Sequence, residues 1–370
     1  MPSSFFPDFQ SYIAQQYPHF AEGARELSPF MVSSEIPRIP HVLHGELGEV
    51  IEILLATRTG EQTTIGCFDF YWTPEGLRLI EINTNAAAWV LVELLRGYHG
   101  IATPDFSPLC KAFRREWALQ SPGTALTHVA IVDETPAQQK THFEFLWIQA
   151  ILRKEGIACE IFAPQDLHFD ENRGALVDTQ GIPWPFVYNR FCDFLLVTPE
   201  ATDLRRAYEA GAVCLRPSPR EYACLSDKTR LAQWSSPEWQ ASVGLSQIQR
   251  EVLSRAIPPV EVMDPAQGER LWAQRKGLFF KPTASYGGKS VYSGKGITRT
   301  AFSRLLESRA LAQPLFQPAS WIAADGSSFK YDLRVYVIGD QIMSVAARLF
   351  QGQVNNFQTL GGGFAAVEFS

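Results

Sequence analysis

The feature that most constrains the fold of this sequence is a strand–turn–strand pattern near its C-terminal end. Residues 331–350 read YDLRVYVIGDQIMSVAARLF, in which two apolar segments flank a Gly-Asp pair. A Gly-Asp pair in this setting predicts a β-hairpin. Arg334 and Arg348 interrupt the two predicted strands. Because a guanidinium group binds phosphate or a tetrahedral oxyanion through two parallel hydrogen bonds, we expect both arginines to point toward one anionic site. The alternative is a surface ion pair between Asp332 and Arg334.

A second predicted hairpin lies near the other end of the sequence. Strand-like segments at 65–72 and 77–82 are joined by the turn sequence TPEG. Glu81 and Asn83 are two residues apart and therefore share one face of their strand, and Asp69 reaches that face from the neighbouring strand. Magnesium prefers such oxygen ligands together with substrate phosphates. We therefore expect Asp69, Glu81 and Asn83 to bind Mg²⁺.

The alternative for this hairpin places its acidic residues in solvent, with Ile80 and Ile82 facing the core. The pattern of residues does not decide between the two arrangements. A helix is expected just before the hairpin, because Leu47, Val50 and Leu54 have the spacing of one apolar helical face.

A glycine-containing loop follows in the last third of the sequence. The segment GLFFKPTASYGGKSVYSG combines strand-like residues 278–281 and 290–292 with Gly287 and Gly288. Paired glycines let successive N–H groups converge on an anion, and Lys281 and Lys289 supply positive charge. The phosphate-binding P-loop motif is excluded, because position 283 is Thr where that motif requires Gly and a strand follows where a helix should begin. An ordinary hairpin with exposed lysines is the alternative.

The middle of the sequence predicts a βαβ unit. The apolar strand HVAIVD at 128–133 precedes a helical pattern over 143–152 and a second strand at 158–162. No GxGxxG follows the first strand, so a dinucleotide site is not supported. The segment VYNRFCDF at 187–194 ends another strand with polar residues. Ligands bind at the carboxyl ends of strands in such sheets, which makes Asn189, Arg190 and Asp193 candidate substrate contacts, with a surface ion pair as the alternative.

Composition and length limit the classes of protein. A chain of 370 residues is expected to form two or three domains, and turn-rich segments place the boundaries at 1–122, 123–222 and 223–370. The net charge of −6 and the lack of basic runs disfavour a nucleic-acid partner. No apolar run approaches the roughly 20 residues of a membrane span, and the first residues do not resemble an export signal, so we expect a cytoplasmic protein. The six isolated cysteines are expected to be reduced and mostly buried. Because dimers are the commonest oligomers of soluble proteins, a homodimer is the default expectation for the oligomeric state.

Together these motifs resemble the ATP-grasp superfamily. SDKTRLAQW at 226–234 resembles the segment with its first ATP-binding lysine, here Lys228, and Lys281 matches its strand lysine. LAQPLFQPA at 311–319 resembles the hinge strand whose backbone reads the adenine edge. The resemblance implies an α/β ATP-grasp fold with a Rossmann-like substrate domain, and ATP and Mg²⁺ as cofactors. It implies nucleotide contacts from Lys228, Lys281, Ser285, Gly287, Gly288, Lys289, Gln313 and Leu315.

The resemblance also implies that the order of motifs is circularly permuted. In an ordinary member, the glycine-rich stretch after the arginine strands is followed by a helix, an Asp strand and a Glu-x-Asn strand. Here those elements stand at the N-terminal end, an arrangement similar to eukaryotic-type glutathione synthetases, whose EINT-like motif and YxR-like strand resemble LIEINTN and VYNR. Permutation is tolerated where the joined ends lie close together at the surface.

The implied function is an ATP-dependent carboxylate–amine or carboxylate–thiol ligase that forms an acyl-phosphate. Its substrates would be small-molecule carboxylates and amines, such as an amino acid or small peptide. Arg334 and Arg348 would stabilise the transferred phosphate, with Asp332 orienting Arg334. A phosphotransferase on the same fold and a non-catalytic nucleotide binder are the alternatives. The remaining implied substrate contacts are Asn85, Asn355, Asn356, Gly361 and Gly362.

Overall fold

The computed structural model describes residues 4–58, 64–283, 292–352 and 357–370. Within these residues, no helix combines the length and apolar character needed to cross a membrane. The helices are α1 Phe5–Gln16, α2 Ala21–Glu26, α3 His41–Ala56, α4 Trp89–Tyr98, α5 Ser107–Gln120, α6 His142–Lys154, α7 Thr202–Glu209, α8 Pro219–Glu221, α9 Thr229–Trp234, α10 Pro237–Ser242, α11 Gln247–Ala256, α12 Gly268–Gln274 and α13 Arg299–Glu307. The strands are β1 Arg38–Ile39, β2 Ile65–Thr73, β3 Gly76–Asn83, β4 His128–Val132, β5 Ala158–Phe162, β6 Leu167–Asp170, β7 Ala175–Asp178, β8 Phe186–Asn189, β9 Cys214–Arg216, β10 Glu261–Val262, β11 Leu278–Pro282, β12 Tyr292–Ser293, β13 Ala310–Pro314, β14 Ser320–Ile322, β15 Ser328–Ile338, β16 Gln341–Phe350, β17 Gly363–Ala366 and β18 Glu368–Phe369.

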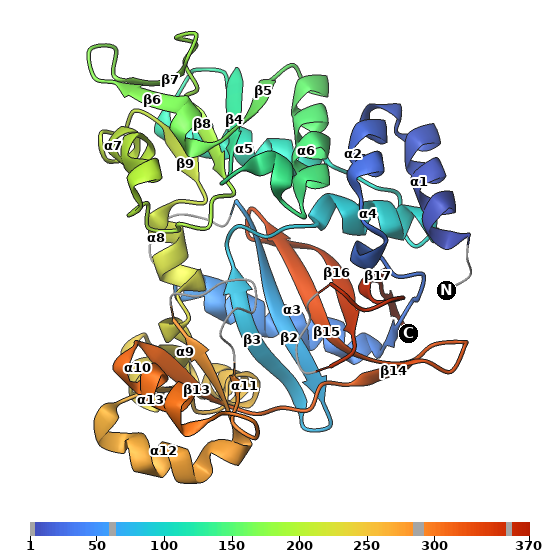
Figure 1. Ribbon diagram of the computed structural model, residues 1–370, viewed down its shortest axis with the longest axis vertical. Helices are drawn as coiled ribbons and strands as arrows, with labels where there is room; N and C mark the ends of the chain where they lie inside the picture. Colours follow the sequence, from blue (N-terminus) through green and yellow to red (C-terminus); the bar gives the residue numbers. More distant parts are fainter. Residues whose placement is uncertain (1–3, 59–63, 284–291, 353–356) are drawn as a thin grey trace.

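The central sheet brings the two predicted hairpins together. Its strand order is β17-β16-β15-β2-β3, so β15 from the C-terminal hairpin pairs directly with β2 from the N-terminal hairpin (Figure 1). Both predicted hairpins are confirmed. The turn of the second hairpin has Gly339 at φ +58° and Asp340 at φ +67°, the positive values that a two-residue turn of the expected type requires.

The two faces of the central sheet are covered by different helices. On one face, Leu47, Val50 and Leu54 of α3 pack with Phe68 and Leu333 in one apolar cluster, which confirms the predicted apolar face of that helix. On the other face, residues of α4 join a second cluster that includes Cys67 and Tyr336 from the sheet. Because side chains alternate along a strand, Asp69 and Arg334 belong to this second face.

Two smaller sheets flank the central one (Figure 1). The order β5-β4-β8-β9 forms a parallel sheet, which confirms the predicted βαβ unit through β4, α6 and β5. The order β10-β13-β11-β12 forms an antiparallel sheet in the lobe that also contains α12 and α13. The domain boundaries at 122/123 and 222/223 stay predictions.

The elements at the two ends of the sequence meet beside α3. β1 pairs in parallel with β18, and the N–H of His41 at the start of α3 donates to the carbonyl of Ser370 at 3.0 Å. Helix α3 precedes in sequence the β2–β3 hairpin with the predicted metal ligands, here named the metal hairpin, and therefore begins where the C-terminal strands end. Four of the six cysteines are buried, as expected: Cys67, Cys110, Cys159 and Cys214.

Candidate nucleotide and metal site

Four charged side chains form a buried network on the α4 face of the central sheet. Arg334 donates from Nε to Asp69 Oδ1 at 2.8 Å and from Nη2 to Asp69 Oδ2 at 2.7 Å. Arg348 donates from Nη2 to the same Oδ2 at 2.9 Å, and from Nε to Asp332 Oδ1 at 2.6 Å. Asp69 has no exposed surface, and Asp332 and Arg334 are also buried. The two arginines therefore meet at the carboxylate of Asp69, and their expected role at a bound anion stays a prediction.

Strand register produces this network. Arg334 lies directly opposite Asp69 between β15 and β2, and Asp332 lies opposite Arg348 between β15 and β16. Cross-strand neighbours of opposite charge stabilise a sheet when they face each other in this way. The expectation that Asp332 orients Arg334 is therefore wrong, because Asp69 holds Arg334 and Asp332 holds Arg348. The alternative of a surface pair is also wrong, because both residues are buried.

The network shifts the pKa values of its members. Burial alone would raise the pKa of Asp69, but Arg334 and Arg348 hold that pKa below its usual value. Burial opposes the charge on Arg334, and Asp69 nevertheless raises its pKa well above the ordinary value. Asp332 has a raised pKa, mainly because of burial.

The hydrogen bonds of the network use Nε and Nη2 of both guanidinium groups. Within the described part of the chain, Nη1 of Arg334 and Nη1 of Arg348 therefore donate to no protein atom.

The predicted metal ligands lie next to this network. Asp69 and Glu81 are direct cross-strand partners, and the amide Nδ2 of Asn83 lies 3.4 Å from both Asp69 Oδ2 and Glu81 Oε1. A bulge after Asp69 leaves Ile80 without a direct partner, and Ile82 packs on the α3 face. The solvent alternative is wrong for Asp69, which is fully buried.

The donor set fits magnesium in one particular way. Among the described residues, no three His, Cys, Asp or Glu side chains are grouped so as to hold a metal ion. Asp69 Oδ2 already accepts hydrogen bonds from Arg334, Arg348 and Asn83. The oxygens of Glu81 and Asn83 are therefore the readiest ligands, which suits an ion that completes its shell with phosphate oxygens and water rather than one held by protein alone.

Two lysines from other elements lie near Glu81. Lys281 on β11 is buried, and its Nζ donates to the carbonyl of Ile80 at 3.4 Å. Lys228, at the start of α9, is half-buried. Burial lowers the pKa of both lysines, Glu81 acts to raise both, and the charge of Lys228 further lowers the pKa of Lys281. Two like charges held close together in a partly desolvated place favour a polyanionic ligand.

The remaining predicted nucleotide contacts divide into two groups. Gln313 lies on β13 opposite Phe279, and its Nε2 donates to the carbonyl of Leu79 at 3.3 Å, so the hinge strand contacts the metal hairpin. The main-chain N–H of Leu315 donates to the carbonyl of Gly277 at 2.8 Å. The predicted loop residues fall outside the described residues: Ser285, Gly287, Gly288 and Lys289.

The predicted substrate residues of the parallel sheet contact the main chain. Asn189 accepts from the N–H of Phe191 at 3.1 Å, and Asp193 accepts from the N–H of Thr198 at 2.7 Å. Arg190 is buried and donates to the carbonyls of Asn85 and Ala86. The alternative of a surface ion pair is wrong for Asn189 and Arg190, which are both buried. A role in substrate binding stays a prediction for all three, and for Asn85.

Close packing explains why glycine occupies the positions near the C-terminal end. The carbonyl of Gly361 accepts from Ser33 Oγ at 2.7 Å, and a Cβ on Gly362 would lie 2.5 Å from the carbonyl oxygen of Leu349. Their role as substrate contacts stays a prediction. Asn355 and Asn356 lie outside the described residues.

Sequence reasoning missed several residues that surround the site. Glu144 on α6 is fully buried and accepts from the N–H of Ala88 at 2.7 Å. Its only signal in the sequence is its position as an acidic residue between Phe143 and Phe145. Tyr336 and Ser226 also reach the segment after β3, and neither carries a sequence signal.

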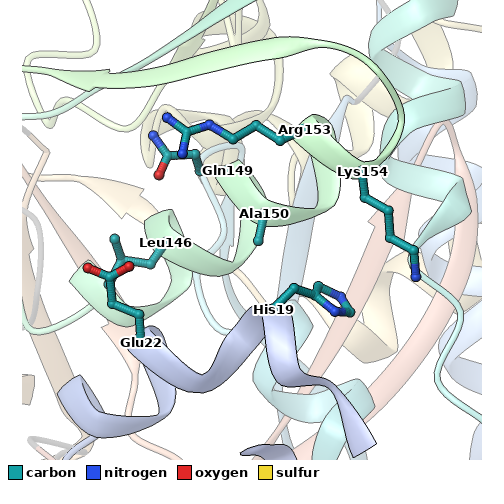
Figure 2. A pocket seen from close by; sticks show the side chains of 8 residues that line it. His19, Glu22, Leu146, Gln149, Ala150, Arg153 and Lys154 are labelled. Atoms are coloured by element: carbon teal, nitrogen blue, oxygen red, sulfur yellow. The ribbon is translucent and has the colours of Figure 1, made fainter.

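A separate surface cavity lies away from these residues. It has a volume of about 470 Å³ and lies between the short 3₁₀ helix Pro18–Phe20 and α2 on one side and α6 on the other (Figure 2). His19, Glu22, Arg153 and Lys154 are among its lining residues. Both signs of charge are present, and Arg153 already pairs with Glu160 at 2.6 Å. None of the predicted site residues lines it.

Comparison with solved structures defines the fold class. The chain is similar to a glutathione synthetase-like effector, GSS30, from Globodera pallida, with a TM-score of 0.57, 11% identity and coverage of 92% of this chain and 90% of that one. It is also similar to a putative γ-glutamylcysteine synthetase from Methylobacillus flagellatus KT, with a TM-score of 0.52, 11% identity and coverage of 91% and 89%. The ATP-grasp ligase PsnB overlays more weakly, with a TM-score of 0.39, 19% identity and coverage of 60% and 72%.

These similarities give the chain the ATP-grasp fold in its circularly permuted form. The similarity to a glutathione synthetase-like protein agrees with the resemblance that the motifs LIEINTN and VYNR predicted. No protein-family model and no curated protein matches the sequence.

Proposed function

We propose that the protein is an ATP-dependent ligase that joins a carboxylate to an amine or thiol through an acyl-phosphate. The observation that carries this proposal is the convergence of two lysines, two arginines and the Glu81–Asn83 pair around Asp69. Cations from four elements, α9, β11, β15 and β16, and oxygen ligands from a fifth, β3, suit a nucleotide triphosphate bound with magnesium better than any ligand without phosphates. The fold supports the same conclusion.

Each group has a distinct part in the proposed chemistry. Lys228 and Lys281 hold the phosphates of ATP, and Glu81 and Asn83, with Asp69 beside them, hold Mg²⁺. When bound, the metal neutralises phosphate charge. Arg334 and Arg348 direct Nη1 toward the transferred phosphate, while their other nitrogens are fixed by Asp69 and Asp332. Because the carboxylates hold the guanidinium groups in place before substrate binds, little reorganisation is needed as charge develops on the phosphoryl group.

The proposed substrates are an amino acid or small peptide as the carboxylate and an amine or thiol as the acceptor. Support comes from the fold similarity to a glutathione synthetase-like effector and a putative γ-glutamylcysteine synthetase. The parallel sheet, whose strand β8 ends at Asn189, is the proposed place for these substrates.

An ADP-release screen over pairs of amino acids, small peptides and amines tests the proposal. Hydroxylamine in the assay should trap the acyl-phosphate as a hydroxamate, and mass spectrometry should find an amide or thioester product. A phosphorylated substrate that does not react with hydroxylamine would instead establish a phosphotransferase.

A matched pair of variants connects the activity to the metal hairpin. Glu81→Gln should lower ADP release by at least about 100-fold while the melting temperature stays within a few degrees, because only a partly exposed carboxylate is neutralised. Glu75→Gln, in the turn of the same hairpin, is the control and should keep full activity. Undiminished turnover in Glu81→Gln would overturn the magnesium assignment.

A further inference from the structure

The segment from Thr84 to Val90 connects the metal hairpin to α4 and is held by side chains from four separate elements. It begins one residue after Asn83, the last residue of β3. Its carbonyls and N–H groups point to different partners, so its path is fixed along its whole length.

The carbonyls of the segment are held by an arginine and a tyrosine. Nη1 of Arg190 donates to the carbonyls of Asn85 and Ala86, the latter at 2.7 Å. The hydroxyl of Tyr336 donates to the next carbonyl, that of Ala87, at 2.8 Å. Three consecutive carbonyls are therefore fixed from two sides, by the residue after β8 and by the strand that carries Arg334.

The N–H groups of the segment are held by other side chains. Glu144 Oε2 accepts from the N–H of Ala88 at 2.7 Å, just before the start of α4. Ser226, two residues before Lys228, accepts from the N–H of Thr84 at 2.7 Å.

The conformation of Ala88 shows that these contacts impose a path on the chain. Ala88 has φ +73°, a left-handed conformation that a residue with a Cβ adopts only when its surroundings require it. Local sequence alone therefore does not set the direction in which the chain leaves β3.

Arg190 has the features of a residue that holds the main chain in place. It is 5% exposed, and its guanidinium lies 5.5 Å from the ring centre of Tyr188, whose hydroxyl also accepts from Nη1 at 3.4 Å. Nη1 of Arg190 is shared among three protein oxygens, two of them carbonyls of the segment after β3, so this end of the guanidinium is fixed to the main chain.

We infer that Arg190 and Tyr336 are positioning residues, which fix the segment after β3 and thereby hold Glu81 and Asn83 in the geometry that binds the metal–nucleotide complex. This inference rests on the proposed function, and it gives Arg190 a role other than direct contact with the substrate. Loosening the carbonyls of Asn85 to Ala87 should allow Asn83 to shift relative to Asp69, and metal coordination is sensitive to shifts of a few tenths of an ångström.

The magnesium dependence of ADP binding, measured by calorimetry, tests this inference. In Arg190→Met, the magnesium concentration that half-saturates tight ADP binding should rise at least about tenfold, while ADP affinity in EDTA stays within about twofold of wild type. Arg190→Lys keeps one charged donor and should recover part of the loss. Tyr336→Phe removes one donor without changing the packed ring and should raise the half-saturating magnesium about fivefold. Arg153→Met removes an arginine from an exposed ion pair with Glu160 and is the control.

The outcomes separate the inference from the proposed function. Wild-type protein whose ADP binding ignores magnesium would overturn the proposed function. Magnesium dependence that is present in wild type and unchanged in Arg190→Met and Tyr336→Phe would overturn the inference alone. An equal loss of ADP affinity in EDTA would also overturn it, since that result describes general damage. If Arg190→Met does not fold, the magnesium dependence of ADP binding in Tyr336→Phe decides whether the inference holds.

Discussion

Replacing Asp69 by Asn tests whether the buried network has the energetic importance that its geometry indicates. The substitution keeps the shape of the side chain but removes the charge that two arginines share. At an effective dielectric constant of about 20, a contact of 2.7 Å or 2.9 Å corresponds to roughly 6 kcal/mol of Coulomb attraction, most of which offsets the desolvation of the charges. Removing one member of a buried pair leaves its partners uncompensated, which costs about 3–5 kcal/mol.

Urea denaturation followed by tryptophan fluorescence measures this loss. We expect Asp69→Asn to lower the free energy of unfolding by about 3–5 kcal/mol at neutral pH. Glu155→Gln is the control, because the pair of Arg114 and Glu155 is 46% and 43% exposed and such surface pairs contribute about 1 kcal/mol or less. A loss below about 1 kcal/mol in Asp69→Asn, equal to that of the control, would refute the reasoning from burial.

The pH profile provides a second check on the same variant. Because the arginines hold the pKa of Asp69 below its unfolded value, the stability that Asp69 contributes is present above about pH 4 and is lost as the pH falls through the lowered folded value. The difference in stability between wild type and Asp69→Asn should therefore be constant at neutral pH and shrink in acid. A difference that grows in acid would contradict the direction of the pKa shift.

Two further variants test other buried charges. Lys281→Met removes a buried ammonium whose pKa burial lowers, so the ligand-free protein should melt at the same or a higher temperature, while ADP with magnesium should raise that temperature less than in wild type. A fall of more than about 5 °C without ligand would contradict this. Burial raises the pKa of Asp133 to about 6, against the opposing effect of Arg190, so its charge destabilises the fold increasingly as the pH rises from about 4 through 6. Asp133→Asn should gain up to about 3 kcal/mol relative to wild type over that range, and urea midpoints at pH 4.5 and 7.5 that show no change would exclude it.

The secondary structure of the site was largely predictable because its signals are local. The Gly-Asp turn and the TPEG turn both lie between segments of strand-forming residues, and both hairpins form. The pairing of β15 with β2 was not predicted, because no local pattern connects residues 265 positions apart.

The pairing of individual charges was not predictable for a specific reason. Next to the turn, Ile338 pairs with Gln341. If the two strands continued from there without a bulge, Arg348 would lie opposite Tyr331. A register shift between Tyr336 and Val337 moves the pairing by one residue and places Asp332 opposite Arg348 instead. A one-residue shift reverses which side chains meet, and nothing in the sequence marks this bulge.

The position of β15 in the middle of the sheet has a consequence for synthesis of the chain. β2 leaves the ribosome with Asp69 about 265 residues before Arg334, which at about 5–20 residues per second is roughly 15–50 s. Throughout that interval β2 is an open edge strand with an unpaired carboxylate, and the central strand of the sheet arrives almost last. Because charge on an edge strand disfavours pairing with other chains, the carboxylate of Asp69 helps protect the open edge of β2 until β15 arrives.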